Sequence, residues 1–243
     1  MLIDARHNVT LPEGRYKTDP GAIIGIAIHH TVTLFFPKPD MTEAEERAHI
    51  QMIDRYHVSQ GWGGFGYHTI TFPSGRTYIT GDLDGARAHV ASRNGELIGC
   101  AFAGDHSTQQ PTDDAYAGGA SAVAAVRAYV AFAGLVVGTV VASRPLPIAG
   151  HRTWALAAWP TSCPGNGLAQ HLDRLDKQQE EAESMLIVPL YRDAVDGDVY
   201  AQVGEVFVHL PDPRQVTRRG WAEMQVLPSP PGKIIVRQAG DSA

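Results

Sequence analysis

A short apolar, β-branched run that ends in two histidines constrains the fold of this chain more than any other sequence feature. Residues 23–28 read Ile-Ile-Gly-Ile-Ala-Ile, a pattern typical of a strand that is buried on both faces of a sheet. His29 and His30 follow directly. Such a strand needs a covering layer on each face. Polar groups at the end of so buried a strand are candidates for a functional site.

The patterns downstream predict alternating helices and strands. Thr42 and Glu45 give the capping-box signature of an amphipathic helix over residues 42–58. The other predicted elements, in chain order, are a hairpin over residues 67–80, a strand over 97–103, an Ala-rich helix over 112–134, a strand over 147–151 and a helix over 168–185.

Composition and charge exclude several classes of protein. No apolar run approaches the roughly 18 residues that a membrane helix needs, and the N-terminus lacks the layout of a signal peptide. We therefore expect that the protein is synthesised in the cytoplasm and does not insert into a membrane. The formal net charge of −6 argues against nucleic acid as a partner. The two cysteines give no disulfide framework, and Cys100 is interpreted as a core residue. Nothing in the sequence indicates an oligomeric state.

His29, His151 and Cys163 are residue types that bind zinc. A catalytic zinc site has three imidazole, thiolate or carboxylate ligands and one open position. The two histidines lie at the ends of separate predicted strands and the cysteine follows a Pro-flanked loop, so a rigid sheet can hold all three. On the residues alone this interpretation is weak. A histidine at a strand end is more often hydrogen-bonded within the protein, and the wide spacing matches no local zinc-finger pattern.

Four segments, in chain order, resemble one enzyme family. They are IAIHHTVT (26–33), GWGGFGYHTITFPSGRTY (61–78), ARAHVASRNGELIGCAFAGD (86–105) and GHRTW…PTSCPGNGL (150–168). The set resembles the type 2 N-acetylmuramoyl-L-alanine amidases, which include phage amidases and the peptidoglycan recognition proteins, over about residues 20–175.

The resemblance implies a zinc amidase and assigns roles to five residues. By this resemblance His29, His151 and Cys163 bind Zn²⁺, and Tyr67 matches the family tyrosine whose phenol orients water or stabilises the oxyanion. Two residues before the cysteine the family carries Lys or Thr, and here the residue is Thr161. Its hydroxyl can donate to the oxyanion but supplies no positive charge. The stretch between His151 and Cys163 is longer than the family's usual one.

Three further residues are candidates for substrate binding. His89 and Asn94 match family positions that line the substrate groove, although loop-structural roles stay open for both. His30 is a third candidate. A strand that persists through His30 would point it to the side opposite His29, so a hydrogen-bonded structural role also stays open for it. His57 and His68 are interpreted as structural.

We predict an α/β fold with a mixed central β-sheet flanked by helices, forming a zinc amidase domain over residues 1–178. Residues 179–185 are expected to end its last helix and to link it to the tail. Residues 186–243 are rich in Val and turn residues, which predicts a small β-rich module with one hairpin and a short helix over 216–221. Its aromatic residues suit a small core. Cell-wall binding is a hypothesis for this module, because phage wall-lysing enzymes often pair a catalytic domain with a binding one.

The predicted function is hydrolysis of the amide that joins the lactyl group of N-acetylmuramic acid to L-alanine in bacterial peptidoglycan. Without a signal peptide, we expect a phage endolysin that acts on the cell wall after release through a membrane lesion made by another protein. The alternatives are a cytoplasmic amidase that recycles wall fragments, a peptidoglycan-binding protein without activity, and a purely structural zinc protein. The last needs a fourth protein ligand.

Overall fold

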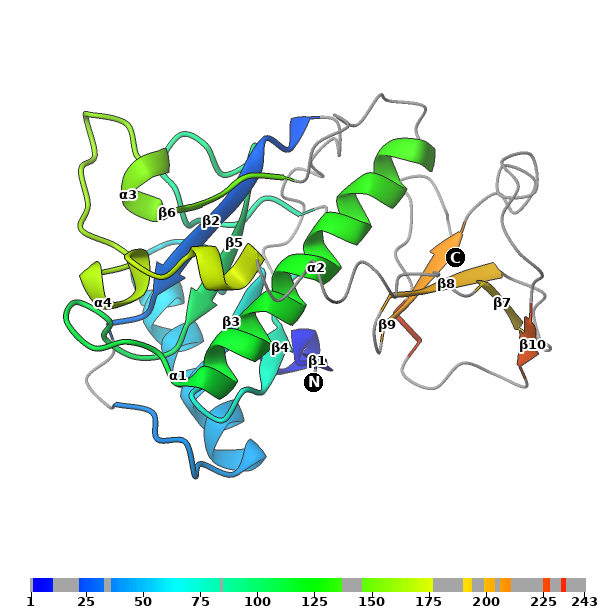
Figure 1. The fold of residues 1–243 in the computed structure, drawn as a ribbon, viewed down its shortest axis with the longest axis horizontal. Helices are drawn as coiled ribbons and strands as arrows, with labels where there is room; N and C mark the ends of the chain where they lie inside the picture. The colour runs from blue at the N-terminus through cyan, green and yellow to red at the C-terminus, as the bar shows by residue number, and fades with distance from the viewer. Residues whose placement is uncertain are drawn as a thin grey trace.

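The computed structural model describes residues 2–10, 22–32, 36–83, 85–136 and 146–176, together with five strands between residues 190 and 234. Up to residue 176 the elements form a six-stranded sheet with helices around it (Figure 1). They are β1 (Leu2–Asp4), η1 (Arg6–Asn8), β2 (Gly25–His30), α1 (Glu43–Ser59), β3 (Thr69–Thr71), β4 (Thr77–Ile79), β5 (Leu97–Phe102), α2 (Asp113–Val136), β6 (Ile148–Gly150), α3 (His151–Trp154) and α4 (Asn166–Ala169).

The sheet has the strand order β1-β4-β3-β5-β2-β6 and mixes parallel and antiparallel pairs. β2 pairs in parallel with β5 on one side and with β6 on the other, so Ile28 lies between Cys100 and Gly150. The hairpin β3–β4 supplies the antiparallel pair. Because β2 and β6 run in the same direction, their carboxyl ends meet at one edge of the sheet. His29 and His151 both lie at that edge.

Helices cover both faces of the sheet, which confirms the predicted architecture. Ile28 and its neighbours on one face pack against Val123 and Val126 of α2. On the other face Ile50 and Ile53 of α1 belong to the same core cluster as the sheet residues. In Figure 1, α2 crosses in front of the sheet and α1 lies behind it. The fully buried β2 therefore sits in the middle layer, as its apolar sequence predicts.

The amino end of α1 has the predicted cap. The hydroxyl of Thr42 accepts from the backbone N–H of Glu45, and the Glu45 carboxylate accepts from the backbone N–H of Thr42. This reciprocal pair satisfies two N–H groups that a helix end leaves without partners. Glu46, one residue further along, is completely buried and accepts from Ser74, Arg76 and Tyr78. These bonds tie α1 to the β3–β4 hairpin.

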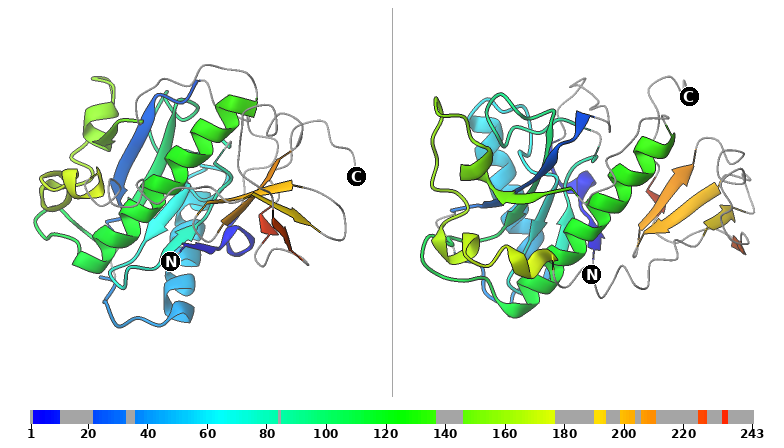
Figure 2. Two further views of the ribbon diagram at one scale, coloured as in Figure 1. Left: turned by 45° about the vertical axis from the view of Figure 1, so that its right-hand side comes forward. Right: turned by 45° about the horizontal axis from the view of Figure 1, so that its top comes forward.

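Two regions differ from the sequence-based expectations. The helix expected over 168–185 starts at Asn166, is interrupted by a turn at residues 170–172 and resumes at 173–176. The tail has more strands than one hairpin: β7 (Leu190–Asp193), β8 (Val199–Val203), β9 (Val206–Leu210), β10 (Gln225–Leu227) and β11 (Lys233–Ile234) form a second sheet. Figure 2 shows this sheet as separate from the first. The short helix expected over 216–221 lies outside the described residues.

Among the described residues, no helix combines the length and the apolar character that crossing a bilayer requires.

Candidate metal centre

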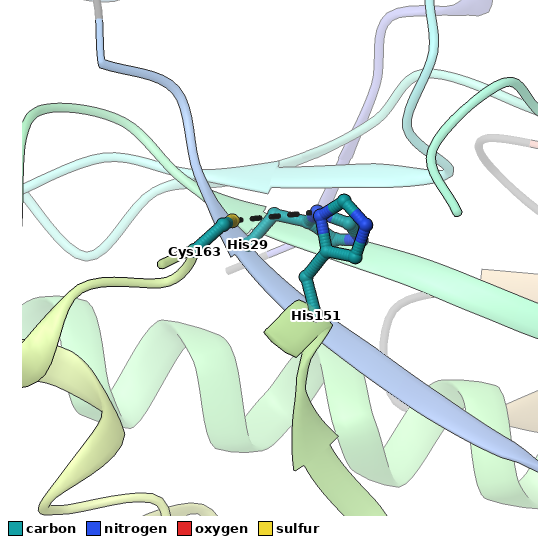
Figure 3. Close-up of side chains that lie close together, drawn as sticks. All are labelled: His29, His151 and Cys163. Atoms are coloured by element: carbon teal, nitrogen blue, oxygen red, sulfur yellow. Dashed lines mark hydrogen bonds between the residues drawn. The ribbon is translucent and has the colours of Figure 1, made fainter. Parts of the chain in front are cut away.

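His29, His151 and Cys163 come together at the edge of the sheet where β2 and β6 end. Their ligand atoms all lie within 4.8 Å of one another. Sγ of Cys163 is 3.6 Å from Nδ1 of His29, and the rings of His29 and His151 have centroids 4.6 Å apart. Figure 3 shows the three side chains converging from β2, from the start of α3 and from the loop before α4. No other group of three potential ligands is found among the described residues.

The geometry and chemistry of these three side chains fit zinc. Tetrahedral Zn–N and Zn–S bonds place neighbouring ligand atoms about 3.3–3.7 Å apart, and the separation between Cys163 and His29 falls in that range. Two imidazoles and one thiolate leave a fourth tetrahedral position open, as in catalytic zinc sites. With the thiolate as the only anionic ligand, a divalent ion there would keep about one positive charge.

Close packing fixes the loop that carries Cys163 against the strand that precedes His151. A Cβ on Gly150 would lie 2.5 Å from Cδ of Pro164, so only glycine allows this approach. The backbone N–H of Arg152 donates to the carbonyl of Cys163 at 2.8 Å. The hydroxyl of Thr161 accepts from the backbone N–H of Cys163 at 3.1 Å. These contacts position two ligands that are twelve residues apart in the chain.

Burial favours the neutral forms of the three candidate ligands. It lowers the pKa of His29 well below its ordinary value, and the neighbouring histidines lower it further. Burial also lowers the pKa of His151. It raises the pKa of the Cys163 thiol to about 12, although the backbone N–H of His30 opposes this rise. The imidazoles are thus ready to bind a metal at neutral pH, whereas the thiol must lose its proton as the metal binds.

Tyr67 lies beside His29, one of the three candidate ligands. Its ring centroid is 5.1 Å from that of His29 and 5.4 Å from that of His57. Burial raises the pKa of the Tyr67 phenol, and the nearby Cys163 raises it further. The phenol therefore keeps its proton over the whole physiological range and can act only as a neutral donor or acceptor.

Both ring nitrogens of His89 make hydrogen bonds within the protein. Nδ1 lies 3.1 Å from Nε2 of His29, and Nε2 lies 3.0 Å from the carbonyl oxygen of Leu97. The side chain is 6% exposed. Both bonds favour the loop-structural role that the sequence left open for His89. Its role in substrate binding stays a prediction.

Asn94 and His30 also have partners within the protein. Oδ1 of Asn94 accepts from the backbone N–H groups of His89 and Val90. Nδ1 of His30 accepts from the backbone N–H of His106, and His30 is not one of the three grouped ligands. Their roles in substrate binding stay predictions. His57 and His68 each accept a backbone N–H at Nδ1, from Gly66 and Gly99.

Two glycines that make room for this site were not predicted from the sequence. A Cβ on Gly99 would lie 2.8 Å from the ring of His89, and Gly150 accommodates Pro164. Both glycines lie in predicted strands. Glycine inside a strand often marks the close approach of another group, and this was the available signal.

Comparison with known proteins identifies the family. Residues 19–166 match the N-acetylmuramoyl-L-alanine amidase family. The match covers more than half of the chain and includes all three candidate ligands. No curated protein is similar enough in sequence to count as a match.

Several solved structures share the fold. The N-acetylmuramoyl-L-alanine amidase LysC from Clostridium intestinale has a TM-score of 0.50 and 18% identity, covering 74% of this chain and 97% of its own. Drosophila peptidoglycan recognition protein SD has a TM-score of 0.53 and 18% identity, covering 71% and 93%. Apis mellifera PGRP-SA has a TM-score of 0.53 and 19% identity, covering 71% and 94%. The family match and the shared fold together show that this chain belongs to the N-acetylmuramoyl-L-alanine amidase family, with the fold of type 2 amidases and peptidoglycan recognition proteins.

Proposed function

We propose that this protein is a zinc-dependent amidase that hydrolyses the bond between the lactyl group of N-acetylmuramic acid and L-alanine in peptidoglycan. The observation that carries the proposal is the convergence of His29, His151 and Cys163 within 4.8 Å, with the ring of Tyr67 beside that of His29. It occurs in a chain whose residues 19–166 match the amidase family. A protein that only binds peptidoglycan does not need a complete set of ligands.

The residues of the chain have distinct parts in this reaction. His29, His151 and Cys163 would hold a zinc ion, whose Lewis acidity would serve to activate water and to polarise the scissile carbonyl. Tyr67 is protonated and buried beside the ligands, so its phenol donates to the oxygen of the carbonyl as negative charge develops there. Thr161 accepts from Cys163 N–H and keeps its own hydroxyl proton as a second donor.

The comparisons support peptidoglycan as the substrate class. Several of the structurally similar proteins are peptidoglycan recognition proteins, and two are N-acetylmuramoyl-L-alanine amidases. One of those amidases, LysCS from Clostridium intestinale, is described as an endolysin and has 19% identity and a TM-score of 0.50. We propose the same biological role here, with residues 186–243 as a wall-binding module.

The activity is tested by measuring new L-alanine amino groups released from purified peptidoglycan. We expect release by the zinc-loaded protein, loss of release after chelation and recovery when zinc is returned. Cys163→Ser should stay inactive in all conditions. Cys100→Ala is the matched control, since Cys100 packs in the core cluster with residues of α2 and is not one of the three grouped residues. No release from zinc-loaded protein on several wall types would favour a binding protein.

The endolysin role is tested by comparing substrates of different size. A lytic enzyme should cleave intact sacculi at least as well as soluble muropeptides and should bind to the sacculi. Strong preference for small soluble fragments would instead favour the recycling of wall fragments.

A further inference from the structure

A chain of hydrogen bonds runs from the backbone of β5 to the candidate metal centre. The carbonyl oxygen of Leu97 lies 3.0 Å from Nε2 of His89, and Nδ1 of His89 lies 3.1 Å from Nε2 of His29. On the far side of the same ring, Nδ1 of His29 lies 3.6 Å from Sγ of Cys163. His89 therefore stands between the backbone and a metal ligand.

The chemistry of these groups fixes the direction of every bond. A carbonyl oxygen can only accept, so Nε2 of His89 must carry a proton and donate to Leu97. A neutral imidazole has one protonated nitrogen, so Nδ1 of His89 has a lone pair and accepts from Nε2–H of His29. By the same rule Nδ1 of His29 is then unprotonated. Its lone pair points to the place where Cys163 and His151 converge.

The alternative would be a doubly protonated His89, and its surroundings oppose it. The side chain is 6% exposed. The groups described around its ring are the rings of His29 and His68 and the carbonyl of Leu97, none of which is acidic. A buried charge without an acidic partner is strongly unfavourable.

We propose that His89 is a positioning residue that holds His29 in its Nε2–H tautomer and aims its Nδ1 lone pair at the metal. This inference rests on the proposed zinc site. Metal-bound histidines commonly donate their second nitrogen to a carboxylate, a backbone carbonyl or water. Here a second histidine, His89, accepts the hydrogen bond from His29. The tautomer of His89 is itself fixed by its bond to the Leu97 carbonyl of β5.

The surrounding backbone keeps His89 in place. Gly99 pairs with Ala27 in the register of β5 and β2, and a Cβ on Gly99 would lie 2.8 Å from the His89 ring. Glycine at this position leaves room for the imidazole on the surface of the sheet. The backbone N–H of His89 is held by Oδ1 of Asn94. These contacts hold the His89 ring in a fixed position next to His29.

Two substitutions with side chains of similar shape separate the effect of the hydrogen-bond acceptor from the effect of packing. In His89→Asn, Oδ1 stands near the position of Nδ1 and can accept from His29, whereas His89→Leu has the same branched shape and no acceptor. We expect His89→Leu to bind zinc about 10- to 100-fold more weakly than wild type, the range typical of lost partners around a metal ligand. His89→Asn should recover most of that affinity. Competition with a chromophoric chelator measures both.

The tautomer itself is observable without metal or activity. Long-range ¹H–¹⁵N correlation spectra of ¹⁵N-histidine-labelled, chelated protein should show His29 and His89 with protonated Nε2 and unprotonated Nδ1. In His89→Leu the His29 signals should show both tautomers. His29 protonated at Nδ1 in the wild type would overturn the inference, as would equal zinc affinity in wild type and both variants. If the wild type binds no zinc, the proposed function fails, while the spectra still decide the tautomer.

Discussion

Gly150 and Pro164 touch so closely that a Cβ added to Gly150 would lie 2.5 Å from Cδ of Pro164. Gly150 directly precedes the ligand His151, and Pro164 directly follows the ligand Cys163. The contact therefore constrains the distance between two of the three candidate ligands. The backbone N–H of Arg152 also donates to the carbonyl of Cys163 at 2.8 Å, which joins the same two segments.

Gly150→Ala should weaken metal binding while leaving the fold in place. The added methyl group must push Pro164 outward, and Cys163 moves with it, so the three ligand atoms no longer match one tetrahedron. We expect zinc affinity to fall about 10- to 100-fold in a chelator competition. Gly95→Ala is the matched control, because a Cβ there meets nothing within 4 Å. Equal affinity in both variants would show that the loop adapts without cost.

Substitutions at Thr161 should reveal whether its hydroxyl positions Cys163 or takes part in catalysis. The hydroxyl accepts from the backbone N–H of Cys163 at 3.1 Å. Thr161→Val keeps the shape and removes that acceptor, so we expect weaker zinc binding, which Thr161→Ser should restore. A loss of about 1 kcal/mol, typical of one hydrogen bond, corresponds to about 5-fold in affinity. If Thr161→Val lowers kcat at full zinc occupancy instead, the hydroxyl acts on the substrate.

The main layers of the fold follow from local sequence patterns. The apolar run before His29 forms the central strand β2, and the Thr42–Glu45 capping box starts α1. β1 was not predicted, because three partly buried residues give no periodic pattern and its formation depends on pairing with β4. The start of α4 at Asn166, two residues before the expected start at residue 168, also depends on contacts from elsewhere. Backbone N–H groups of Asn166 and Gly167 donate to carbonyls of the loop after β5.

The candidate site was predictable as a set of residue types but not as an arrangement. The side-chain chemistry of His29, His151 and Cys163 suits zinc, and the family resemblance implies that these three residues bind it. The relation between His89 and His29 depends on the register of β2 against β5 and on the space above Gly99. Neither can be derived from a single sequence, because pairs of strands distant in the chain set both.

Tyr67→Phe should lower the rate of catalysis without removing the metal. The phenol lies beside the ligands, and burial keeps it protonated, so the variant loses a donor to the developing oxyanion and keeps the ring packing. We expect kcat to fall about 10²- to 10³-fold, as for other single oxyanion donors. Zinc content is measured on the same sample. A variant with full zinc and wild-type kcat would show that Tyr67 has only a packing role.

Buried histidines should make this fold sensitive to acid, and His57 offers the clearest test. Burial lowers the pKa of His57 to about 4, and its Nδ1 accepts the backbone N–H of Gly66. In the unfolded chain the pKa returns to about 6.5. Between these values the unfolded state binds more protons, so the free energy of unfolding falls as the pH falls, by up to about 1.4 kcal/mol per pH unit for each such group.

His57→Asn should reduce the slope of the free energy of unfolding against pH by the contribution of one titrating group. Asn Oδ1 can still accept from the backbone N–H of Gly66 but does not titrate. Urea unfolding of the chelated protein at several values between about pH 5 and pH 7.5 measures the slope in both proteins. Gly95→Ala, where an added Cβ meets nothing within 4 Å, is the control and should keep the wild-type slope. An unchanged slope in His57→Asn would mean that His57 is protonated in the folded protein, with Asp54 as its charge partner.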